Sequence, residues 1–162
     1  MKSEQRAFLK TPLGYVEIDC SEKGIRRLEF IDFTVRIKRT PACLKECKEQ
    51  LSEYFKGKRR EFTIPLDLEG TPFQLRVWNE LLKVPFGKTI SYHDLAKRIG
   101  EEKALRAVGG ANARNPVSII VPCHRVIGMN GKLVGYGGGL KRKKWLLEHE
   151  YAFAQRDLFY NK

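Results

Sequence analysis

The chain has 162 residues, 42% hydrophobic and 10% aromatic, which is enough apolar content for one packed domain or two small ones. Its 31 lysines and arginines exceed 19 aspartates and glutamates, and the net charge of +12 favours a polyanionic partner, nucleic acid first, over a merely solvated basic surface. Composition excludes a membrane partner, because no run approaches the ~20 apolar residues of a span and the charged N-terminus lacks a signal-peptide apolar segment. We therefore expect a monomeric protein of the cytoplasm, or of the nucleus in a eukaryote.

The first part of the chain is predicted to form an antiparallel sheet. Apolar and polar side chains alternate along residues 13–18 and again along residues 25–30, as in half-buried strands. Gly24 lies between these runs and indicates a turn. Residues 61–65 are expected to return one more strand to this sheet.

One helix is predicted beside the sheet. Apolar residues recur at helical spacing over residues 41–55, and Gly57 is placed to end the helix. Residues 67–71 resemble a linker. These patterns predict a small N-terminal support domain at residues 1–68 and a second domain at residues 69–162.

The four cysteines are expected to be free thiols, because a chain without a secretion signal stays in a reducing compartment. Cys20, Cys43 and Cys47 are predicted to pack in the core. Cys43 and Cys47 share a helix face at i, i+4 spacing, so a metal site is the alternative, and we predict none.

The second domain is predicted to be mainly helical. Thr71 and Pro72 form an N-cap and first-turn pair for a helix that runs to about Leu82. At the far end, a glycine-rich loop over residues 131–139 precedes a last amphipathic helix, which begins with the basic run 141–144.

A helix-turn-helix is predicted between these two helices. Ser91 caps a short helix that Gly100 ends, and a second helix runs from about residue 103 to residue 113. Two short helices joined through a glycine-containing turn are typical of this motif. The predicted fold class is therefore α+β, with a winged-helix-like C-terminal domain.

The second helix of this pair carries unusually small side chains. Residues 107–113 read AVGGANA, where a sequence-specific reader would carry Arg, Gln or Asn. Each glycine costs about 1 kcal/mol in a helix interior, and close approach of another backbone is the usual reason to keep it. Either this helix enters the narrow minor groove of DNA with little sequence preference, or it packs tightly inside the protein.

Cys123 lies in a segment that favours reactivity. Residues 121–126 read VPCHRV, so His124 and Arg125 follow the sulfur directly. A thiol attacks only as thiolate, and a free cysteine with a pKa of about 8.5 is mostly protonated at neutral pH, so a base or cation beside it matters. Residues 117–120 are predicted to be a short buried strand that delivers this loop. A buried structural cysteine is the alternative.

Five motifs occur in order along the second half of the chain. They read RAVGGA, NP, VPCHRV, GYGGGL and WLLEHE, at residues 106–111, 115–116, 121–126, 135–140 and 145–150. Over residues 71–150 the chain resembles the O6-alkylguanine-DNA alkyltransferases, and LSEYFKG at residues 51–57 extends the likeness. The resemblance implies a protein that flips O6-alkylguanine, mainly O6-methylguanine, out of duplex DNA and takes the alkyl group once, without a cofactor, with O4-methylthymine as an open second substrate.

The resemblance also implies a nucleophile and a proton relay. Cys123 would attack the alkyl carbon in a single displacement. His124 would accept the thiol proton through a water, and Glu150 would orient and stabilise the histidine, as in a hydrolase triad. Tyr92 would give a proton to the leaving guanine ring, and Asn115 would tie the recognition helix to the cysteine loop.

A DNA-binding face and a base pocket follow from the same resemblance. Arg106 would fill the gap that the flipped base leaves in the stack. The remaining minor-groove contacts are assigned to Ala107, Gly109, Gly110, Ala111, Tyr92 and Arg114. The pocket for the flipped base is assigned to Pro122, Cys123, Val126, Tyr136 and Gly137.

Three departures from family patterns concern the pocket and the metal content. Gly137 stands where some members have serine, and Ser118 where some have proline, which leaves the size of the accepted alkyl group open. Some members hold a structural zinc in their N-terminal half, but the histidines of this chain are His93, His124 and His149.

A non-catalytic DNA-binding module is the alternative function, either a reader of alkylation damage or a transcription regulator. Readers related to this family lack the cysteine, whereas Cys123 is present. A cysteine hydrolase is a further alternative, which the basic second half with its slim helix disfavours.

Overall fold

The computed structural model describes residues 5–36 and 38–160, without the side chains of residues 157–160. The chain divides between Glu69 and Gly70 into two compact units, each of which is considered by itself. Residues 1–4 of the first predicted domain and residues 161–162 of the second lie outside the described residues. Among the helices of the described ranges, none is both long and apolar enough to cross a membrane.

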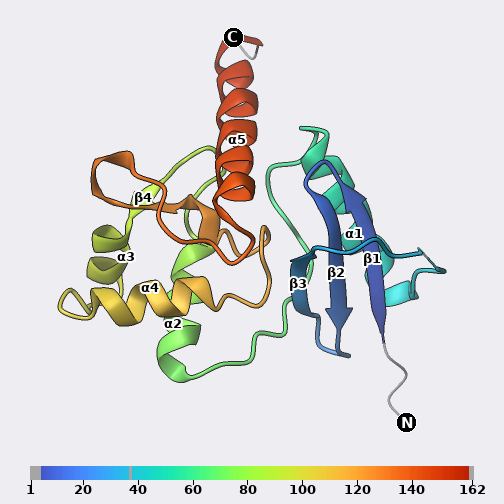
Figure 1. The fold of residues 1–162 in the computed structure, drawn as a ribbon, viewed down its shortest axis with the longest axis horizontal. Coiled ribbons are helices and arrows are strands. Elements are labelled where there is room, and N and C mark those ends of the chain that lie inside the picture. Colours follow the sequence, from blue (N-terminus) through green and yellow to red (C-terminus); the bar gives the residue numbers. More distant parts are fainter. Residues whose placement is uncertain (1–4, 37, 161–162) are drawn as a thin grey trace. The chain divides into compact units, whose positions relative to one another are not determined.

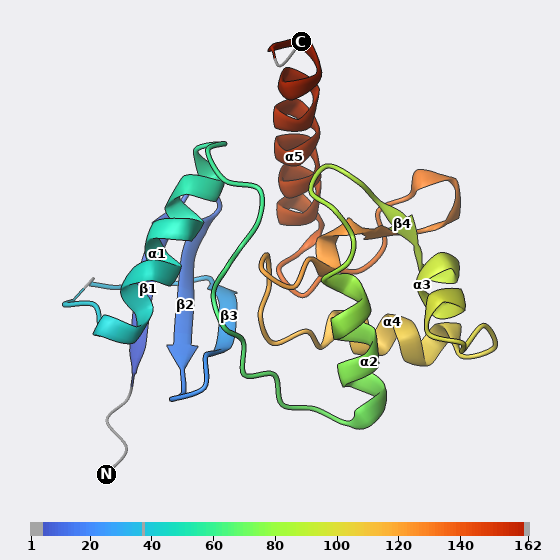
Figure 2. The same cartoon turned by 180° about the vertical axis from the view of Figure 1, so that it is seen from behind.

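In residues 5–36 and 38–69, the described part of the N-terminal unit, three antiparallel strands and one helix occur (Figures 1 and 2). The elements are β1 (Arg6–Thr11), β2 (Gly14–Cys20), β3 (Ile25–Ile31) and α1 (Ala42–Phe55). Val16 and Ile18 of β2 are fully buried, because alternate side chains of a strand share one face. Leu44, Leu51 and Tyr54 of α1 are also fully buried. The predicted sheet and helix are confirmed, with β1 as an additional strand.

The predicted strand over residues 61–65 is wrong. This segment meets β3 through only two backbone hydrogen bonds, from Ile25 N to Pro65 O and from Asp67 N to Ile25 O, both 2.9 Å. Pro65 has no N–H to continue a ladder. Gly24 has φ +154, and a side chain there would collide with the Pro65 carbonyl, which explains the glycine.

The prediction of four free thiols is wrong for two of them. Cys20 at the end of β2 and Cys43 near the start of α1 are paired as a disulfide, and Cys43 is exposed rather than buried. Packing of α1 on the sheet brings these residues together across 23 positions of sequence, which the periodicity could not reveal. Cys47 is a buried thiol, and burial raises its pKa to about 12. Within the described ranges, no cluster of three or more metal-ligating side chains occurs.

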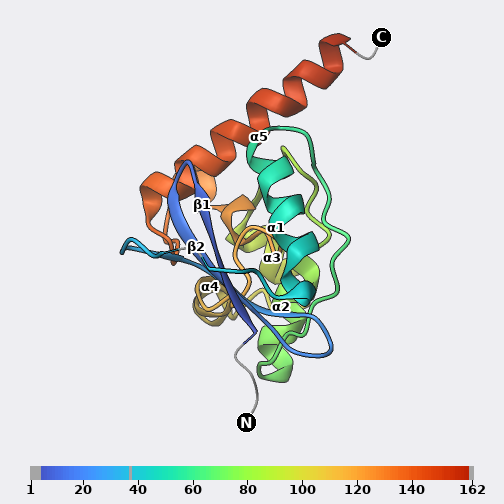
Figure 3. The same ribbon diagram turned by 90° about the vertical axis from the view of Figure 1, so that its right-hand side faces the viewer.

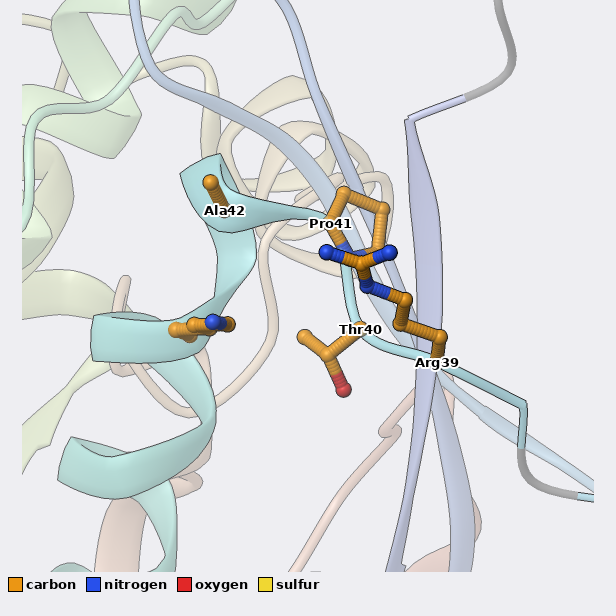
Figure 4. Close-up of a pocket in the computed structure, with 5 residues that line it drawn as sticks. Arg39, Thr40, Pro41 and Ala42 are labelled. Carbon is orange, nitrogen blue, oxygen red and sulfur yellow. The ribbon is translucent and has the colours of Figure 1, made fainter.

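A hollow of about 280 Å³ opens where the chain enters α1 (Figure 4). Its lining consists of Arg39, Thr40, Pro41, Ala42 and Lys45. Lys48 Nζ already donates a hydrogen bond to the Thr40 hydroxyl, at 3.0 Å. The lining offers cations but no nucleophile beside a base, so this hollow is not a candidate active site.

The C-terminal unit is mainly helical, as predicted. Its elements are α2 (Pro72–Leu81), β4 (Ile90–Ser91), α3 (Tyr92–Arg98), α4 (Leu105–Ala113), the 3-10 helix η1 (Cys123–Arg125), β5 (Val126–Ile127), the 3-10 helix η2 (Met129–Gly131) and α5 (Leu140–Tyr160). Capping boxes begin α2 at Thr71 and α3 at Ser91. The last turns of α5 project beyond the other elements of this unit (Figure 3).

α3 and α4 form the predicted helix-turn-helix, and both contact α2 (Figure 1). Leu95 of α3 and Val108 of α4 are fully buried in this packing. Trp78 of α2 donates its indole N–H to the carbonyl of Ala111 at 2.8 Å. β4 and β5 pair in parallel over two residues beside these helices. This arrangement fixes α4 at the surface of the unit and brings η1 behind it.

Candidate active site

The segment before Cys123 is a buried turn rather than the predicted strand. Ile120 N donates to Ser118 O at 2.8 Å, and Val121 N donates to Val117 O at 3.0 Å, so the chain folds back on itself. Ile119 has φ +73, a left-handed conformation that costs a β-branched residue on the order of 1–3 kcal/mol. The apolar run is buried as expected, but burial alone did not distinguish a strand from a turn.

Two asparagines hold this turn against α4. Asn115 donates from Nδ2 to Val121 O at 2.7 Å and accepts from Val117 N at 3.0 Å. Asn112 donates from Nδ2 to the carbonyl of Cys123 at 3.3 Å. The sequence motifs point to Asn115 but not to Asn112, although a polar residue on the buried face of a small-residue helix is a usable signal.

His124 and Glu150 lie against each other inside the unit. Cys123 opens η1 and is 4% exposed, and His124 and Glu150 are equally buried. Nε2 of His124 is 2.5 Å from Oε2 of Glu150. No described protein group hydrogen-bonds Nδ1 of His124, so this nitrogen remains for a second partner.

Arg125 completes the surroundings of Glu150. Its Nε and Nη2 donate to the two carboxylate oxygens at 2.7 and 3.2 Å, and its Nη1 donates to Val84 O at 2.7 Å. The backbone N–H of Gly87 donates to Oε1 at 3.2 Å. The guanidinium, which the sequence placed beside the sulfur, is therefore engaged by Glu150. A bidentate arginine fixes both the position and the charge of this carboxylate.

Burial and charge together set the protonation of the site. Burial raises the pKa of the Cys123 thiol, against the opposing effects of Asn115 and the Lys143 charge, so the resting sulfur is protonated. Burial lowers the pKa of His124, with Glu150 opposing, so the ring is neutral at neutral pH. Burial alone would raise the pKa of Glu150, but His124 and Arg125 hold it below its ordinary value. An ionised Glu150 requires the proton on Nε2, which leaves Nδ1 as an acceptor.

These pKa shifts predict that the folded protein loses stability in acid. The pKa of His124 is below 6.5 in the folded state, so below about pH 6.5 the unfolded chain gains a proton that the folded chain does not bind. The contribution of ionised Glu150 to the free energy of unfolding is complete above about pH 4.5. It is lost as the pH falls through the lowered pKa of Glu150 in the folded state. As the pH is lowered from about 7.5 to about 4, the urea concentration at the unfolding midpoint should therefore fall, and it should fall more steeply than in a His124→Asn variant. Equal slopes in the two proteins would contradict this assignment.

Two tyrosines flank the cysteine segment. The Tyr92 hydroxyl, on α3, donates to Val134 O at 2.9 Å, and burial raises its pKa, so the phenol keeps its proton. Burial also raises the pKa of Tyr136 well above its usual value. An ionised Cys123 would raise both pKa values further. A Cβ on Gly137 would lie 3.6 Å from Ala113 O, so the glycine-rich loop passes the end of α4.

α4 presents most of the predicted DNA-binding residues on its outer face. Arg106, Ala107, Gly110 and Arg114 are exposed, and Gly109 is half-buried. Ala111 differs, because its side chain is 4% exposed. Pro122 and Val126, assigned to the base pocket, are buried beside η1.

The structure argues against one of the two explanations of the α4 glycines, tight packing inside the unit. A Cβ on Gly110 would meet no described atom within 4 Å, and a Cβ on Gly109 would meet only the Tyr92 ring, at 4.0 Å. Packing inside the unit therefore requires neither glycine. Contact of these glycines with the minor groove of DNA, the other explanation, stays a prediction.

Fold and site together define a class: a helix-turn-helix unit that carries a buried cysteine beside a histidine, glutamate and arginine cluster. Residues 72–152 match the family model of the 6-O-methylguanine DNA methyltransferase DNA binding domain, and residues 5–68 match that of the ribonuclease-like domain of the same proteins. The chain belongs to the 6-O-methylguanine DNA methyltransferase family.

Relatives and solved structures match along nearly the whole chain. The methylated-DNA–protein-cysteine methyltransferase of Mycobacterium bovis is 45% identical over 155 residues, 93% of this chain and 94% of the relative. That of Methanosarcina acetivorans is 43% identical over 150 residues, 89% of this chain and 96% of the relative. Mycobacterium tuberculosis O6-methylguanine methyltransferase has a TM-score of 0.86 at 41% identity, with 99% of this chain and 100% of that chain covered. Mycobacterium tuberculosis OGT in complex with DNA has a TM-score of 0.82 at 45% identity, over 90% and 92% of the two chains.

Proposed function

We propose that this protein repairs DNA by transferring the alkyl group of O6-alkylguanine to Cys123, once per molecule. One observation carries the proposal: a buried cysteine is followed by a neutral histidine whose Nε2 is engaged by an ionised glutamate. That arrangement supplies a nucleophile, a base and the counter-charge for the base. Relatives named methylated-DNA–protein-cysteine methyltransferase support the same reaction.

The first step removes the thiol proton. His124 accepts it at Nδ1 through a water, and the ring becomes an imidazolium. Glu150 stabilises that charge across the 2.5 Å contact, while Arg125 keeps the carboxylate ionised and in place. The thiolate therefore exists only briefly, when a substrate is present to consume it.

The second step is a single displacement. The Cys123 sulfur attacks the alkyl carbon, the carbon–O6 bond breaks, and its electron pair stays on guanine. Tyr92, whose raised pKa keeps it protonated, exchanges its hydrogen bond to Val134 O for the guanine ring and gives the ring a proton. The proton that His124 took from the thiol then returns through water to the Tyr92 oxygen, so that both residues end neutral. The net change moves the alkyl group from oxygen to sulfur and one proton from sulfur to guanine. A thioether has no acyl or phosphoryl centre for water to attack, so the protein stops after one transfer.

DNA binding is assigned to the C-terminal unit. α4 would enter the minor groove with Ala107, Gly109 and Gly110 towards the DNA, while Arg106 fills the vacated stack position and Arg114 contacts the backbone. The flipped guanine would lie among Pro122, Val126, Tyr136 and Gly137, next to Cys123. Residues 1–68 are proposed to support this unit, and Asn115 to link α4 with the cysteine turn. Such a protein would act where the chromosome lies, in the cytoplasm or, in a eukaryote, in the nucleus.

A labelled-methyl assay tests the proposal directly. Duplex DNA with a radiolabelled O6-methylguanine is incubated with the protein, and the label on each is counted. The expected result is transfer that stops at one methyl per protein molecule, with the label recovered on the peptide that contains Cys123. Label that stays on the DNA while the protein binds it would favour a damage reader instead.

Gly110→Ala is predicted to stabilise the free protein and weaken its DNA binding. Alanine should add about 1 kcal/mol to the free energy of unfolding, because the site has open space and helical backbone. The added methyl group would stand between α4 and the DNA. The dissociation constant for O6-methylguanine duplex should therefore rise about tenfold, which corresponds to a loss of roughly 1.4 kcal/mol of binding free energy. Urea unfolding and fluorescence anisotropy measure the two effects. Unchanged affinity in the stabilised variant would leave the glycines without a DNA role.

A further inference from the structure

A buried lysine lies in the C-terminal unit without a role in the reaction described above. Lys143, in the first turn of α5, is fully buried, whereas Lys141 and Lys144 beside it are exposed. Nothing in the basic run 141–144 distinguishes this lysine from its exposed neighbours. A buried ammonium costs several kcal/mol unless polar partners replace its water. Its partners should therefore show what it does.

Lys143 has a backbone carbonyl for each of its N–H donors. Its Nζ donates to Val126 O at 2.6 Å, to Val134 O at 3.0 Å and to Gly135 O at 3.1 Å. A protonated ammonium has three N–H groups, and a neutral amine has two. Burial lowers the pKa of Lys143 to about 8, and the nearby Cys123 opposes this shift. The protonated form of Lys143 is thus the one whose N–H groups match the three carbonyl acceptors.

The three carbonyls belong to two segments of the chain. Val126 is the first residue of β5 and lies three positions after Cys123. Val134 and Gly135 are in the loop that leads directly to Tyr136. Lys143 therefore fastens the strand that leaves the nucleophile to the loop that enters the proposed base pocket.

Tyr92 is held at the same point. Val134 O, which accepts from Lys143, also accepts from the Tyr92 hydroxyl at 2.9 Å. The Lys143 Nζ lies 5.7 Å from the centroid of the Tyr92 ring, within the range of a cation–π contact. Displacement of Val134 would therefore move the acceptor of the proposed proton donor.

Besides Lys143, the loop is held by the Tyr92 hydroxyl at Val134 O and by the approach of the Val134 side chain to Gly128. Gly131, Lys132, Val134 and Gly135 are exposed, so this segment buries little apolar surface of its own. Its backbone closes through Gly128 N to Lys132 O at 2.7 Å. A segment with few buried contacts samples open conformations unless it is fastened elsewhere.

We propose that Lys143 is a positioning residue for alkyl transfer. Its ammonium joins the loop at residues 134–135 to β5 through hydrogen bonds, an interaction that we call the Lys143 clip, and so aligns Tyr92 and the base pocket with Cys123. This inference rests on the proposed function. Its positive charge also acts on Cys123 in the direction that favours the thiolate. Its three N–H groups donate to backbone carbonyls, so its effect is exerted through the loop and through Tyr92.

Lys143→Met tests the clip, because methionine fills similar space without donors. In single-turnover transfer from O6-methylguanine duplex at saturating DNA, the rate constant should fall about 100-fold, the scale of a misplacement near 1 Å. The dissociation constant for DNA should change less than about threefold, roughly 0.7 kcal/mol. Lys144→Met is the matched control, since Lys144 is 67% exposed and its contact with Glu148 is long, at 3.9 Å. Its rate constant should stay within about twofold of wild type.

Two further readouts separate the clip from ordinary packing. Hydrogen exchange over residues 128–137 should be faster in Lys143→Met than in Lys144→Met, with α2 and α4 unchanged. Methylammonium should restore part of the rate to Lys143→Ala, because it can occupy the vacated donor site.

Any of the following outcomes would overturn the inference. A wild-type rate in Lys143→Met would show that space filling suffices, and failure of this variant to fold would show a global rather than a local role. A parallel loss of DNA affinity would place Lys143 in binding. Absence of transfer by the wild-type protein in the same assay would overturn the proposed function and this inference with it, so the two failures are distinguishable.

Discussion

Replacing Cys123 by serine is expected to abolish alkyl transfer and to leave binding to O6-methylguanine duplex within about threefold of wild type, roughly 0.7 kcal/mol. A serine hydroxyl is nearly isosteric with the thiol, so the turn held by Asn112 and Asn115 should persist. Displacement at an alkyl carbon favours a soft, polarisable thiolate, and a serine hydroxyl is far less ionised than a thiol beside the same base. Labelled methyl per protein molecule, counted at completion, should fall from one to the background of the assay.

Cys47→Ser is the matched control, because Cys47 is the other free cysteine of the described residues and is equally buried. Burial raises its pKa to about 12, so it should contribute no thiolate. This variant should transfer one methyl at close to the wild-type rate. Label on Cys123→Ser protein would show that another residue accepts the group, and peptide mapping would identify it.

Local signals in the sequence predicted the elements that position the site. The capping residues Thr71 and Ser91 gave the starts of α2 and α3 correctly, because a cap acts through bonds to the next three residues. Helical periodicity located α1 for a similar reason, since the spacing of its apolar residues defines the buried face. The motif around Cys123 marked the candidate nucleophile before any geometry was known.

Features that depend on tertiary contacts were not predictable. Ile119 belongs to an apolar run that fits a strand, but tertiary packing holds it in a left-handed turn. Lys143 stands in a basic run that does not distinguish it from its neighbours, and three carbonyls from other segments make its burial tolerable. Arg125 was expected at the sulfur, whereas its long side chain reaches Glu150. Pairing between Cys20 and Cys43 depends on the packing of α1 against the sheet.

The two asparagines of the site show both what the sequence predicts and what depends on tertiary contacts. Asn115 precedes a proline, and its likeness to a family position drew attention to it. Asn112 lies inside α4, where its buried amide binds the Cys123 carbonyl. Its role followed only from the placement of η1 behind the helix, a relation between segments separated by 11 residues.

Glu150→Gln is expected to cause the second large loss, in both stability and transfer. The amide leaves the Arg125 charge buried without its counter-ion, which should cost about 3–5 kcal/mol of unfolding free energy. It also removes the charge that stabilises the His124 imidazolium. A glutamine amide can donate to Nε2 and so move the ring proton to Nδ1, which would remove the acceptor for the thiol proton. Transfer should slow by a factor on the order of 10⁴, the scale seen when a triad carboxylate is made an amide.

Glu148→Gln is the matched control for these measurements, since Glu148 lies on the same helix and is 67% exposed. Its unfolding free energy should stay within about 0.5 kcal/mol of wild type. Urea unfolding and single-turnover transfer would be measured on both variants. A wild-type transfer rate in Glu150→Gln would remove the carboxylate from the relay.

The double variant Glu150→Gln with Arg125→Met separates the two losses. Methionine removes the uncompensated charge, so part of the lost stability should return, although Val84 O loses its donor. Transfer should remain as slow as in Glu150→Gln, because the imidazolium still lacks its counter-charge. If transfer returned together with stability, Glu150 would serve only to neutralise Arg125. Persistent slow transfer in a stable protein would instead assign the carboxylate to the chemistry of His124.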